Sequence, residues 1–268
     1  MTYKSIIVEI KDEIATLTLN RPAKLNALNP QLLRETATAV KLLNEDESVK
    51  ALIMTGAGRG FCSGADLSGD LSITDRKQPG ASRAERTGPF AALGWGIQQM
   101  NKFTKPIIAA VNGPAVGAGL SYALAADIRI ASEKATFSAI FIKRGLVPDA
   151  GVSFYLPRLV GISKAMELMW TGEIINAREA ERIGLVNRVV PHDELIKSAR
   201  DFALQLAEGP SLAIDMVKQM ARTSLKVDSV VTQMGIEDYM QRIAGDSEDA
   251  IEGRTAFLEK RPTRFKGK

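Results

Sequence analysis

The sequence predicts an α/β domain followed by a helical C-terminal region. Two observations predict this fold class. Short apolar segments of strand character alternate with helical segments up to residue 192, and the pattern is helical almost throughout from residue 193. Alternation of strands and helices is typical of α/β proteins. We therefore expect a core domain over residues 1–192 and a helical oligomerisation region over residues 193–268, packed on the core or on another subunit.

The first strand and helix are predicted from residue spacing and a capping pair. Residues 14–19 read I-A-T-L-T-L, which suits a strand with one buried face. Asn29 is a good helix cap, and Pro30 fits the first turn of the helix that follows. One face of this helix is expected to carry the apolar and small residues Leu32, Leu33, Thr36, Ala37, Val40 and Leu43.

The remaining elements of the core follow the same alternation. Further strands are expected at residues 49–55, 106–111 and 127–131, and a helix of small residues at 117–126. Asn176 and Glu179 have the spacing of a helix-capping box. The stretch from Ser68 to Pro89 has little apolar content, so it is either a solvated surface loop or a lid over a site.

The composition limits the classes of partner. The 268 residues carry a net charge of +4 with 45% hydrophobic residues, which suits an anionic small ligand. The basic residues are too scattered to predict nucleic-acid binding. Cys62 is the single cysteine, so no intramolecular disulfide can form, and no apolar run approaches the roughly 20 residues that span a bilayer. With no signal-peptide pattern in residues 1–9, we expect a cytoplasmic protein without membrane partners.

Two glycine-rich turns are the first candidates for chemistry. Residues 61–67 read F-C-S-G-A-D-L, residues 112–119 read N-G-P-A-V-G-A-G, and each turn follows an apolar strand. Small residues permit close backbone approach to a ligand, and N–H groups at a helix start are unsatisfied. Two such turns that converge make an oxyanion hole. Ordinary strand-to-helix turns have the same spacing, so both interpretations remain open on this evidence.

Longer motifs resemble the crotonase (enoyl-CoA hydratase/isomerase) superfamily. They are N-R-P-A-K-L-N-A-L, F-C-S-G-A-D-L, A-A-V-N-G-x-A-x-G-A-G, G-L-V-P-D-A-G, A-x-x-I-G-L-V-N-R-V-V and A-F-L-E-K-R-P, in family order along nearly the whole chain. The resemblance implies a spiral of β-β-α units with a C-terminal helical trimerisation region. It also implies an acyl-CoA substrate, a homotrimer or dimer of trimers, and no cofactor or metal beyond the coenzyme A of the substrate.

The resemblance also assigns site residues by position. The thioester oxygen is expected between the backbone N–H groups of Ala65 and Ala118, the latter where many members have glycine. Because the donor is the backbone, that difference is mild. Matching the family's CoA-binding and substrate-binding positions are Lys24, Leu25, Ala27, Ser63, Asp66, Leu67, Ser121, Phe141, Phe257 and Lys260. The last pair corresponds to residues that often reach the CoA 3′-phosphate across a subunit boundary.

The carboxylates depart from the hydratase pattern. The two positions at which hydratases of this family hold water with glutamates are Ser121 and Phe141 here. Asp149, in G-L-V-P-D-A-G, is an acid in a motif position, and the pattern is closest to ring-1,2-epoxyphenylacetyl-CoA isomerases and other double-bond isomerases. One carboxylate suffices to move a proton between two carbons of an enolate. We therefore expect an isomerase with Asp149 as proton shuttle.

Three alternatives remain for Asp149. It could serve an enoyl-CoA hydratase with non-standard catalytic residues, or act as the nucleophile of a dehalogenase-like or hydrolase-like member. The histidine that dehalogenases use is absent around Gln98, Gln99 and Met100, which counts against that chemistry. An aspartate between proline and Ala-Gly is also a good helix cap, with a helix expected to start at Ala150.

Overall fold

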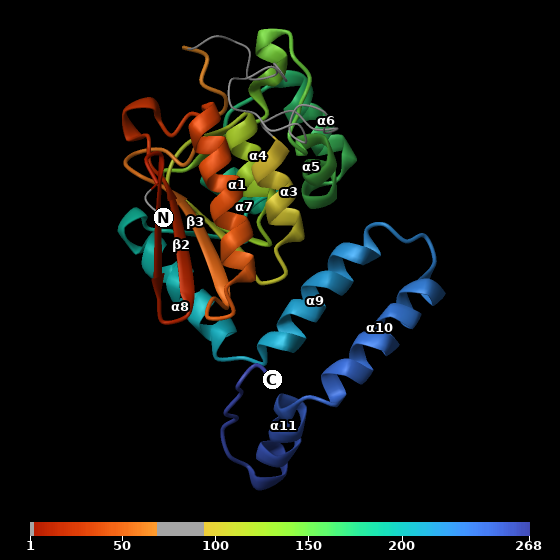
Figure 1. Ribbon diagram of the computed structural model, residues 1–268. Coiled ribbons are helices and arrows are strands. Elements are labelled where there is room, and N and C mark those ends of the chain that lie inside the picture. Colours follow the sequence, from red (N-terminus) through yellow and green to blue (C-terminus); the bar gives the residue numbers. More distant parts are fainter. Residues whose placement is uncertain (1–2, 69–93) are drawn as a thin grey trace, which may run out of the picture.

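The computed structural model describes residues 3–68 and 94–268 of the chain (Figure 1). The expected lid falls almost entirely on residues 69–93, outside the described residues. Six strands form the main sheet in the order β1-β2-β3-β4-β6-β9, in which β1 is antiparallel to β2 and the later pairings are parallel. Their bounds are Ile6–Lys11, Ile14–Leu19, Ala51–Gly56, Ile107–Val111, Ile128–Ser132 and Arg188–Val190. A smaller sheet joins β5 (Ala115–Val116), β7 (Thr136–Ser138) and β8 (Ile175–Asn176).

Helices cover both faces of the main sheet. The helices of the core are α1 (Pro30–Glu45), α3 (Gly94–Lys102), α4 (Ala118–Ala125), α5 (Val152–Val160), α6 (Ile162–Thr171), α7 (Ala177–Arg182) and α8 (Leu195–Ala207). Short 3-10 helices span Pro22–Lys24, Ile140–Arg144 and His192–Glu194. Leu52 and Met54 of β3 point to the face covered by α1, α3 and α4, whereas Ala51 and Ile53 face α8. Because alternate residues of a strand face opposite sides, both faces of β3 are apolar and buried.

The predicted elements are present, with small shifts at their ends. The α/β expectation is confirmed, and Asn29 caps α1 by accepting a hydrogen bond from the Leu32 N–H at 2.9 Å. Asn176 caps α7 in the same way, through the Glu179 N–H. One residue of the expected buried face is wrong: Ala39 is buried in α1, whereas Ala37 is half-buried. The drift of a 3.6-residue period over four turns accounts for such a difference.

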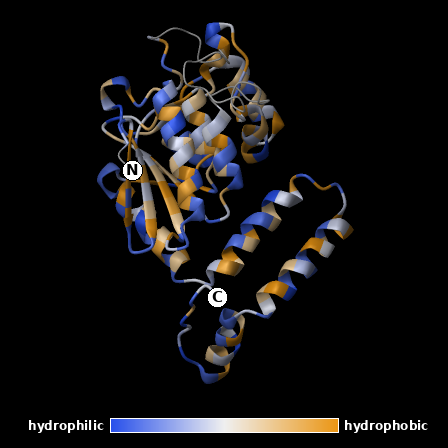
Figure 2. Ribbon diagram, viewed as in Figure 1, coloured by the Kyte–Doolittle hydropathy of each residue, from blue (hydrophilic) through white to orange (hydrophobic). Residues whose placement is uncertain are grey.

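The C-terminal region divides into two parts with different packing. Helix α8 lies against the main sheet through Leu195, Ala199, Ala203 and Ala207, so it completes the core. Beyond it, α9 (Ser211–Ser224) and α10 (Val230–Gly245) form a helical hairpin, and α11 (Glu248–Glu259) follows at its base. Figure 1 shows this arm extending away from the core. Hydrophobic residues recur along α10 (Figure 2). The exposed residues of this helix include Val230, Val231, Met234 and Tyr239.

A charged cluster anchors the arm to the core. Asp127, which precedes β6, pairs with Lys218 at 2.7 Å and with Arg222 at 2.6 Å, both on α9. The Asp127 carboxylate also accepts a hydrogen bond from the Ile107 N–H. Arg222 donates further to the carbonyls of Met100 and Ala125. The Lys218 side chain is only 8% exposed, so its charge depends on Asp127 for compensation.

We predict that Asp127→Ala destabilises the protein much more than the loss of an exposed ion pair. Removing Asp127 leaves the buried Lys218 charge without its ion-pair partner and with only the weaker attraction of Asp215, which costs roughly 2 to 4 kcal/mol in unfolding free energy. Asp238→Ala is the matched control, because the Asp238–Arg242 pair on α10 is exposed and its loss costs about 0.5 kcal/mol or less. Chemical denaturation of the three proteins measures the difference. Equal stability of the two variants would contradict this account of the anchor.

Candidate active site

The first glycine-rich turn is held in place by backbone pairing with the segment before α1. The Leu28 N–H donates to the Gly64 carbonyl at 2.7 Å, and the Asp66 N–H donates to the Leu28 carbonyl at 3.0 Å. This pattern is a parallel bridge between Leu28 and Ala65. In a parallel bridge the middle residue directs its own N–H to the opposite side. The N–H of Ala65 therefore points away from Leu28.

The second turn pairs directly with the first. The Cys62 N–H donates to the Pro114 carbonyl at 2.9 Å, and the Val116 N–H donates to the Cys62 carbonyl at 3.0 Å. Gly117 has a φ of 56° and stands as the cap residue of α4, so Ala118 is the first residue of that helix. The N–H groups of a first helical turn have no partner within their helix. The chain therefore brings the Ala118 N–H to the edge of the first turn.

The two turns approach each other more closely than side chains would permit. A Cβ atom placed on Gly64, whose φ is 94°, would lie 2.8 Å from the Val116 carbonyl oxygen and 3.5 Å from the Ala118 nitrogen. A Cβ atom on Gly119 would lie 2.1 Å from the Cys62 carbonyl oxygen. Among the described residues, neither the Ala65 N–H nor the Ala118 N–H has a hydrogen-bond acceptor. Two adjacent free donors of this kind can stabilise a negatively charged oxygen.

The positions beside this pair of donors carry no glutamate. Phe141, in the 3-10 helix Ile140–Arg144, is buried, and its Cζ atom lies 4.0 Å from where a Cβ of Gly117 would stand. Ser121, on α4, is fully buried, and its hydroxyl donates to the Asp149 carbonyl oxygen at 3.5 Å. Phe141 therefore gives an apolar wall, and Ser121 places the main chain of Asp149 close to α4.

Asp149 lies in the turn before α5 and does not cap that helix. The helix begins at Val152, two residues later than expected, and its cap residue is Gly151, which makes no side-chain capping bond. The backbone carbonyl of Asp149, not its carboxylate, accepts the Val152 N–H at 3.1 Å. The helix-cap interpretation is therefore wrong, because Ala150 and Gly151 take the chain through positive φ angles of 47° and 93° before the helix starts.

The Asp149 carboxyl is a weaker acid than an ordinary aspartic acid. Its side chain is exposed at the wall of a cavity, yet the surrounding protein removes enough water that burial raises the pKa of Asp149. The hydrogen bond to its own N–H opposes this change to a lesser extent. A carboxylate with a raised pKa is a stronger base, which suits proton transfer near neutral pH.

A cavity of about 910 Å³ opens beside Asp149. It lies between α3, the C-terminal end of α4, α5 and the end of α9. Ile97, Leu124, Phe154 and Leu159 give it apolar walls, and Tyr155 hydrogen-bonds to Asn101 at its side. Of the residues predicted for the site, Asp149 lines this cavity, whereas Ala65, Ala118, Ser121 and Phe141 are not part of its lining.

The residues expected to bind CoA fall into two groups. Lys24, Leu25, Ala27 and Ser63 lie together at the first turn, where the Ser63 hydroxyl donates to the Lys24 carbonyl at 3.3 Å and the Ser63 N–H to the Leu25 carbonyl. Lys24 is exposed. Phe257 and Lys260 lie at the end of α11, apart from the core (Figure 1), and the Phe257 side chain is 82% exposed. One chain alone does not bring the two groups together.

Asp66 and Leu67, which follow Ala65, differ in their surroundings. Asp66 pairs with Arg21 at 2.7 Å and accepts hydrogen bonds from Ser68. The hydrogen bond from the Ser68 side chain, followed by that from Arg21, lowers the pKa of Asp66 to about 2. Its carboxylate therefore orders the turn. The Leu67 side chain is 48% exposed and free to contact a ligand.

The sequence interpretation gave no role to Arg21, Asn26, Tyr155 or Asn101. Asn26 is fully buried, and its side-chain amide donates to the backbone carbonyls of Ala57 and Gly60. The side-chain Oδ1 atom of Asn26 accepts a hydrogen bond from the Arg21 N–H. It thereby ties the segment before α1 to the first turn. The motif N-R-P-A-K-L-N contains both Arg21 and Asn26, so a signal was present for them. No local pattern pointed to Tyr155 or Asn101.

Cys62 and a second hollow give no competing site. Cys62 is fully buried, and its thiol donates to the Asn26 carbonyl. Burial raises the pKa of the thiol to about 12, so it is not a nucleophile near neutral pH.

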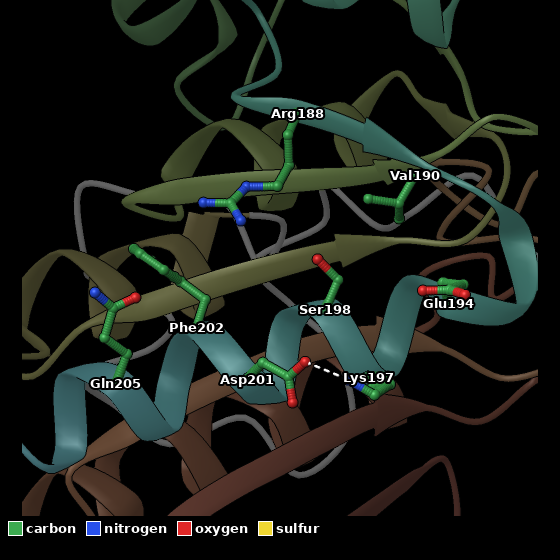
Figure 3. Close-up of a pocket in the computed structure, with 8 residues that line it drawn as sticks. All are labelled: Arg188, Val190, Glu194, Lys197, Ser198, Asp201, Phe202 and Gln205. Carbon is green, nitrogen blue, oxygen red and sulfur yellow. Dashed lines mark hydrogen bonds and ion pairs between the residues drawn. The ribbon is translucent and has the colours of Figure 1, made fainter.

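A second hollow, of about 260 Å³, lies between β9 and α8. Figure 3 shows residues that line it, with Arg188 near the Phe202 ring and Lys197 paired with Asp201. None of the predicted site residues lines it.

No membrane-crossing helix or metal cluster occurs in the part of the chain that the structure describes. None of the helices there is both long and apolar enough to span a bilayer. No group of three His, Cys, Asp or Glu residues within the same ranges could hold a metal ion.

We predict that Gly119→Ala destabilises the protein by separating the two turns. The added methyl group would meet the Cys62 carbonyl, and relieving such a clash costs about 1 to 3 kcal/mol. Gly235→Ala is the control, since a Cβ atom there meets nothing within 4 Å, and alanine in an exposed helix is neutral or stabilising by up to about 1 kcal/mol. Thermal unfolding compares them. A melting temperature for Gly119→Ala at or above that of the unsubstituted protein would contradict the close approach.

Comparison with known proteins identifies the family. Residues 9–268 match the enoyl-CoA hydratase/isomerase family. The chain is 38% identical to a 1,2-epoxyphenylacetyl-CoA isomerase of Escherichia coli, over 98% of each chain, and 38% identical to a crotonyl-CoA hydratase of Syntrophomonas wolfei, over 99% of each. A crystal structure of a putative enoyl-CoA hydratase from Streptomyces coelicolor covers 100% of this chain and 96% of its own, with a TM-score of 0.91 and 34% identity. The expected crotonase fold is thereby confirmed, and the chain belongs to the enoyl-CoA hydratase/isomerase family.

Proposed function

We propose that this protein is an isomerase that moves a double bond in an unsaturated acyl-CoA, with Asp149 as the proton shuttle. The observation that carries the proposal is the set of side chains beside the free N–H donors of Ala65 and Ala118. Ser121 and Phe141 occupy two of these positions, and Asp149 supplies the carboxylate. Hydration needs one group to activate water and another to protonate carbon, whereas an allylic shift needs one base that returns its proton.

The proposed mechanism uses the two donors and the base in sequence. The thioester oxygen lies between the Ala65 and Ala118 N–H groups, which stabilise the negative charge that forms on it when Asp149 removes a proton from the acyl chain. The resulting dienolate has electron density on its α and γ carbons. Asp149 then returns the proton to the other carbon, which shifts the double bond. The raised pKa of Asp149 makes the carboxylate more basic and the carboxylic acid stable enough to hold the proton.

Relatives of comparable similarity bear both isomerase and hydratase names. An isomerase at 38% identity supports the proposal, while a probable enoyl-CoA hydratase of Rhodobacter capsulatus at 39% identity keeps hydration as the second candidate. In a hydratase, the hydroxyl of Ser121 and the carboxylate of Asp149 would hold the water. The two reactions give different products from the same substrates, so one assay separates them.

We further propose that the active form is a homotrimer or a dimer of trimers. The exposed apolar residues of α10 support a covered surface there, since contiguous exposed apolar side chains mark interaction sites. In such an assembly Phe257 and Lys260 of one chain meet the CoA bound to a partner chain. Lys24, Leu25, Ala27, Ser63 and Leu67 would hold the same CoA from the chain that supplies the donors.

We predict that removing the carboxylate of Asp149 abolishes most of the isomerase activity. With 3-enoyl-CoA and 2-enoyl-CoA substrates in deuterated water, we expect interconversion with deuterium at the α or γ carbon, and a fall in kcat of about 100-fold or more in Asp149→Asn. Activity should fall as the pH drops through the raised pKa of Asp149, because the base must be ionised. Asp46→Asn, at the C-terminal end of α1 and outside the set of residues that line the cavity, is the control and should keep full activity.

Two results would count against this assignment. Full turnover by Asp149→Asn would exclude Asp149 as the base. Accumulation of 3-hydroxyacyl-CoA from 2-enoyl-CoA, without any shift of the double bond in 3-enoyl-CoA, would identify a hydratase instead.

We predict that Lys260 of one chain binds the CoA held by a partner chain. We expect Lys260→Glu to raise KM for the acyl-CoA, because the new charge repels the 3′-phosphate. Mixed oligomers of the Lys260→Glu and Asp149→Asn chains should regain activity at low substrate concentration. Random assortment in a cyclic trimer gives about a quarter of the sites an intact Asp149 and a partner's intact Lys260. No recovery on mixing would contradict action across the boundary.

A further inference from the structure

The turn that carries Asp149 has a backbone conformation that its surroundings must maintain. Ala150 has a φ of 47° and Gly151 a φ of 93°, both in the left-handed region. A residue with a Cβ atom pays roughly 1 kcal/mol or more for this conformation, which persists only when neighbouring groups hold it. The contacts on either side of residues 149–151 therefore control where the Asp149 carboxylate stands.

Helix α4 holds one side of this turn. The buried hydroxyl of Ser121 donates to the Asp149 carbonyl oxygen at the long distance of 3.5 Å. That contact fixes the main chain of Asp149 against α4 but does not constrain Gly151, two residues further on. The glycine needs a second support.

Tyr155 supplies the second support from within α5. A Cβ atom on Gly151 would lie 2.9 Å from Cε2 and 3.3 Å from Cδ2 of Tyr155, so the ring packs closely against the glycine through these two atoms. The Tyr155 N–H also donates to the Gly151 carbonyl at 3.0 Å. The ring thus occupies the space into which the turn would otherwise relax.

Asn101 on α3 fixes the position of that ring. The Tyr155 hydroxyl donates to the Asn101 Oδ1 atom at 2.8 Å, and the Asn101 Nδ2 atom donates to the Ile97 carbonyl at 3.1 Å. The amide is therefore oriented by its own helix before it receives the hydroxyl. A chain of contacts runs from α3 through Asn101 and Tyr155 to Gly151 and the base.

We propose that Tyr155, held by Asn101, is a positioning residue for Asp149: its ring fixes the left-handed turn and shields the carboxylate from water. Tyr155, Asn101 and Asp149 line the same cavity, so the ring occupies volume beside the turn that water would otherwise fill. The inference rests on the proposed function of Asp149 as the base. It predicts a loss in the chemical step rather than in binding, since neither Tyr155 nor Asn101 lies at the CoA-binding turn.

The same ring should also affect the electrostatics of the site, because it takes up volume beside the turn. Burial is the main cause of the raised pKa of Asp149. Removing the ring admits water to the carboxylate, and hydration favours the charged form, so the pKa of Asp149 falls. The acidic limb of the pH–rate profile must then move to lower pH. A residue with a purely structural role lowers stability without moving this limb.

The test compares Tyr155→Ala, Tyr155→Phe and Asn101→Ala with the unsubstituted protein. For Tyr155→Ala we expect kcat to fall about 10- to 100-fold with KM changed less than about threefold, as a misplaced catalytic group causes. The acidic limb should move down by about half a pH unit or more. Tyr155→Phe and Asn101→Ala keep the ring but free it, so smaller changes in the same direction are expected. If Tyr155→Ala does not fold, Tyr155→Leu replaces it.

Phe154→Ala is the matched control for losing an aromatic ring from the same cavity. Phe154 packs edge-on against Tyr155, with ring centroids 5.2 Å apart, and lines the cavity. Its N–H donates to the Gly151 carbonyl, but its ring is not among the groups nearest to a Cβ atom on Gly151. Its loss should change KM and leave the acidic limb in place. The proposal would be overturned if the acidic limb moved equally in Phe154→Ala and Tyr155→Ala, or if it moved in neither variant. An unchanged kcat in Tyr155→Ala would overturn it as well.

A measurement without substrate separates this inference from the proposed reaction. Carbon-13 NMR of aspartate-labelled protein, with the Asp149 signal assigned by its absence in Asp149→Asn, follows the titration of this carboxyl directly. A lower pKa in Tyr155→Ala supports the shielding even if no double-bond isomerisation is found. An unchanged pKa excludes it even if the isomerase activity is present.

Discussion

The pairing of the two glycine-rich turns is the interaction on which the rest of the site depends. Cys62 donates its N–H to Pro114 and accepts the N–H of Val116, so the turns after β3 and β4 are joined as neighbouring strands are. This pairing is possible because Gly64 and Gly119 lack side chains at the closest approach. It leaves the N–H groups of Ala65 and Ala118 without acceptors in the described residues, with Ala118 at the start of α4 and Gly64, the neighbour of Ala65, packed against it. Backbone donors held by a sheet lose little energy to reorganisation when charge develops.

The surroundings of these donors combine an apolar wall with one carboxylate. Phe141 is buried beside the second turn, apolar side chains line the cavity, and burial raises the pKa of Asp149. The addition of water needs polar groups that hold it, whereas the proposed proton transfer between carbons needs one base. The fold supports either reaction, and relatives of similar identity bear both names. The chemistry is therefore decided by a few side chains on an unchanged backbone framework.

The C-terminal arm contrasts with the compact core. Helix α8 is buried against the sheet, whereas none of the residues of α10 is buried. Asp127 holds the base of the arm through Lys218 and Arg222, and Arg222 also contacts the carbonyl of Met100 on α3. Helix α3 in turn carries Asn101, which holds Tyr155. The anchor of the arm and the support of the proposed base thus meet on the same short helix.

Local patterns in the sequence were sufficient for the elements and for the two turns. The strand at residues 14–19, the caps at Asn29 and Asn176, and the glycine-rich turns each depend on interactions within a few residues, and all were predicted correctly. The family resemblance, rather than spacing, selected Ala65 and Ala118 from the turns. The helix cap expected as an alternative at Asp149 was wrong because the left-handed turn at Ala150 and Gly151 depends on Tyr155 and Ser121 as well as on the turn's own residues.

The sequence by itself determined which backbone groups could become free donors, because glycine placement and strand-to-helix order are local properties. Only the tertiary structure decided that the two turns pair, that Asp149 faces a cavity, and that Asn101 reaches Tyr155 from another helix. Those contacts join residues that are tens of positions apart, and each depends on the packing of helices against the sheet. Contacts between residues so far apart in the chain cannot be predicted from the spacing of residues in a single sequence, because the side chains that meet share no local pattern.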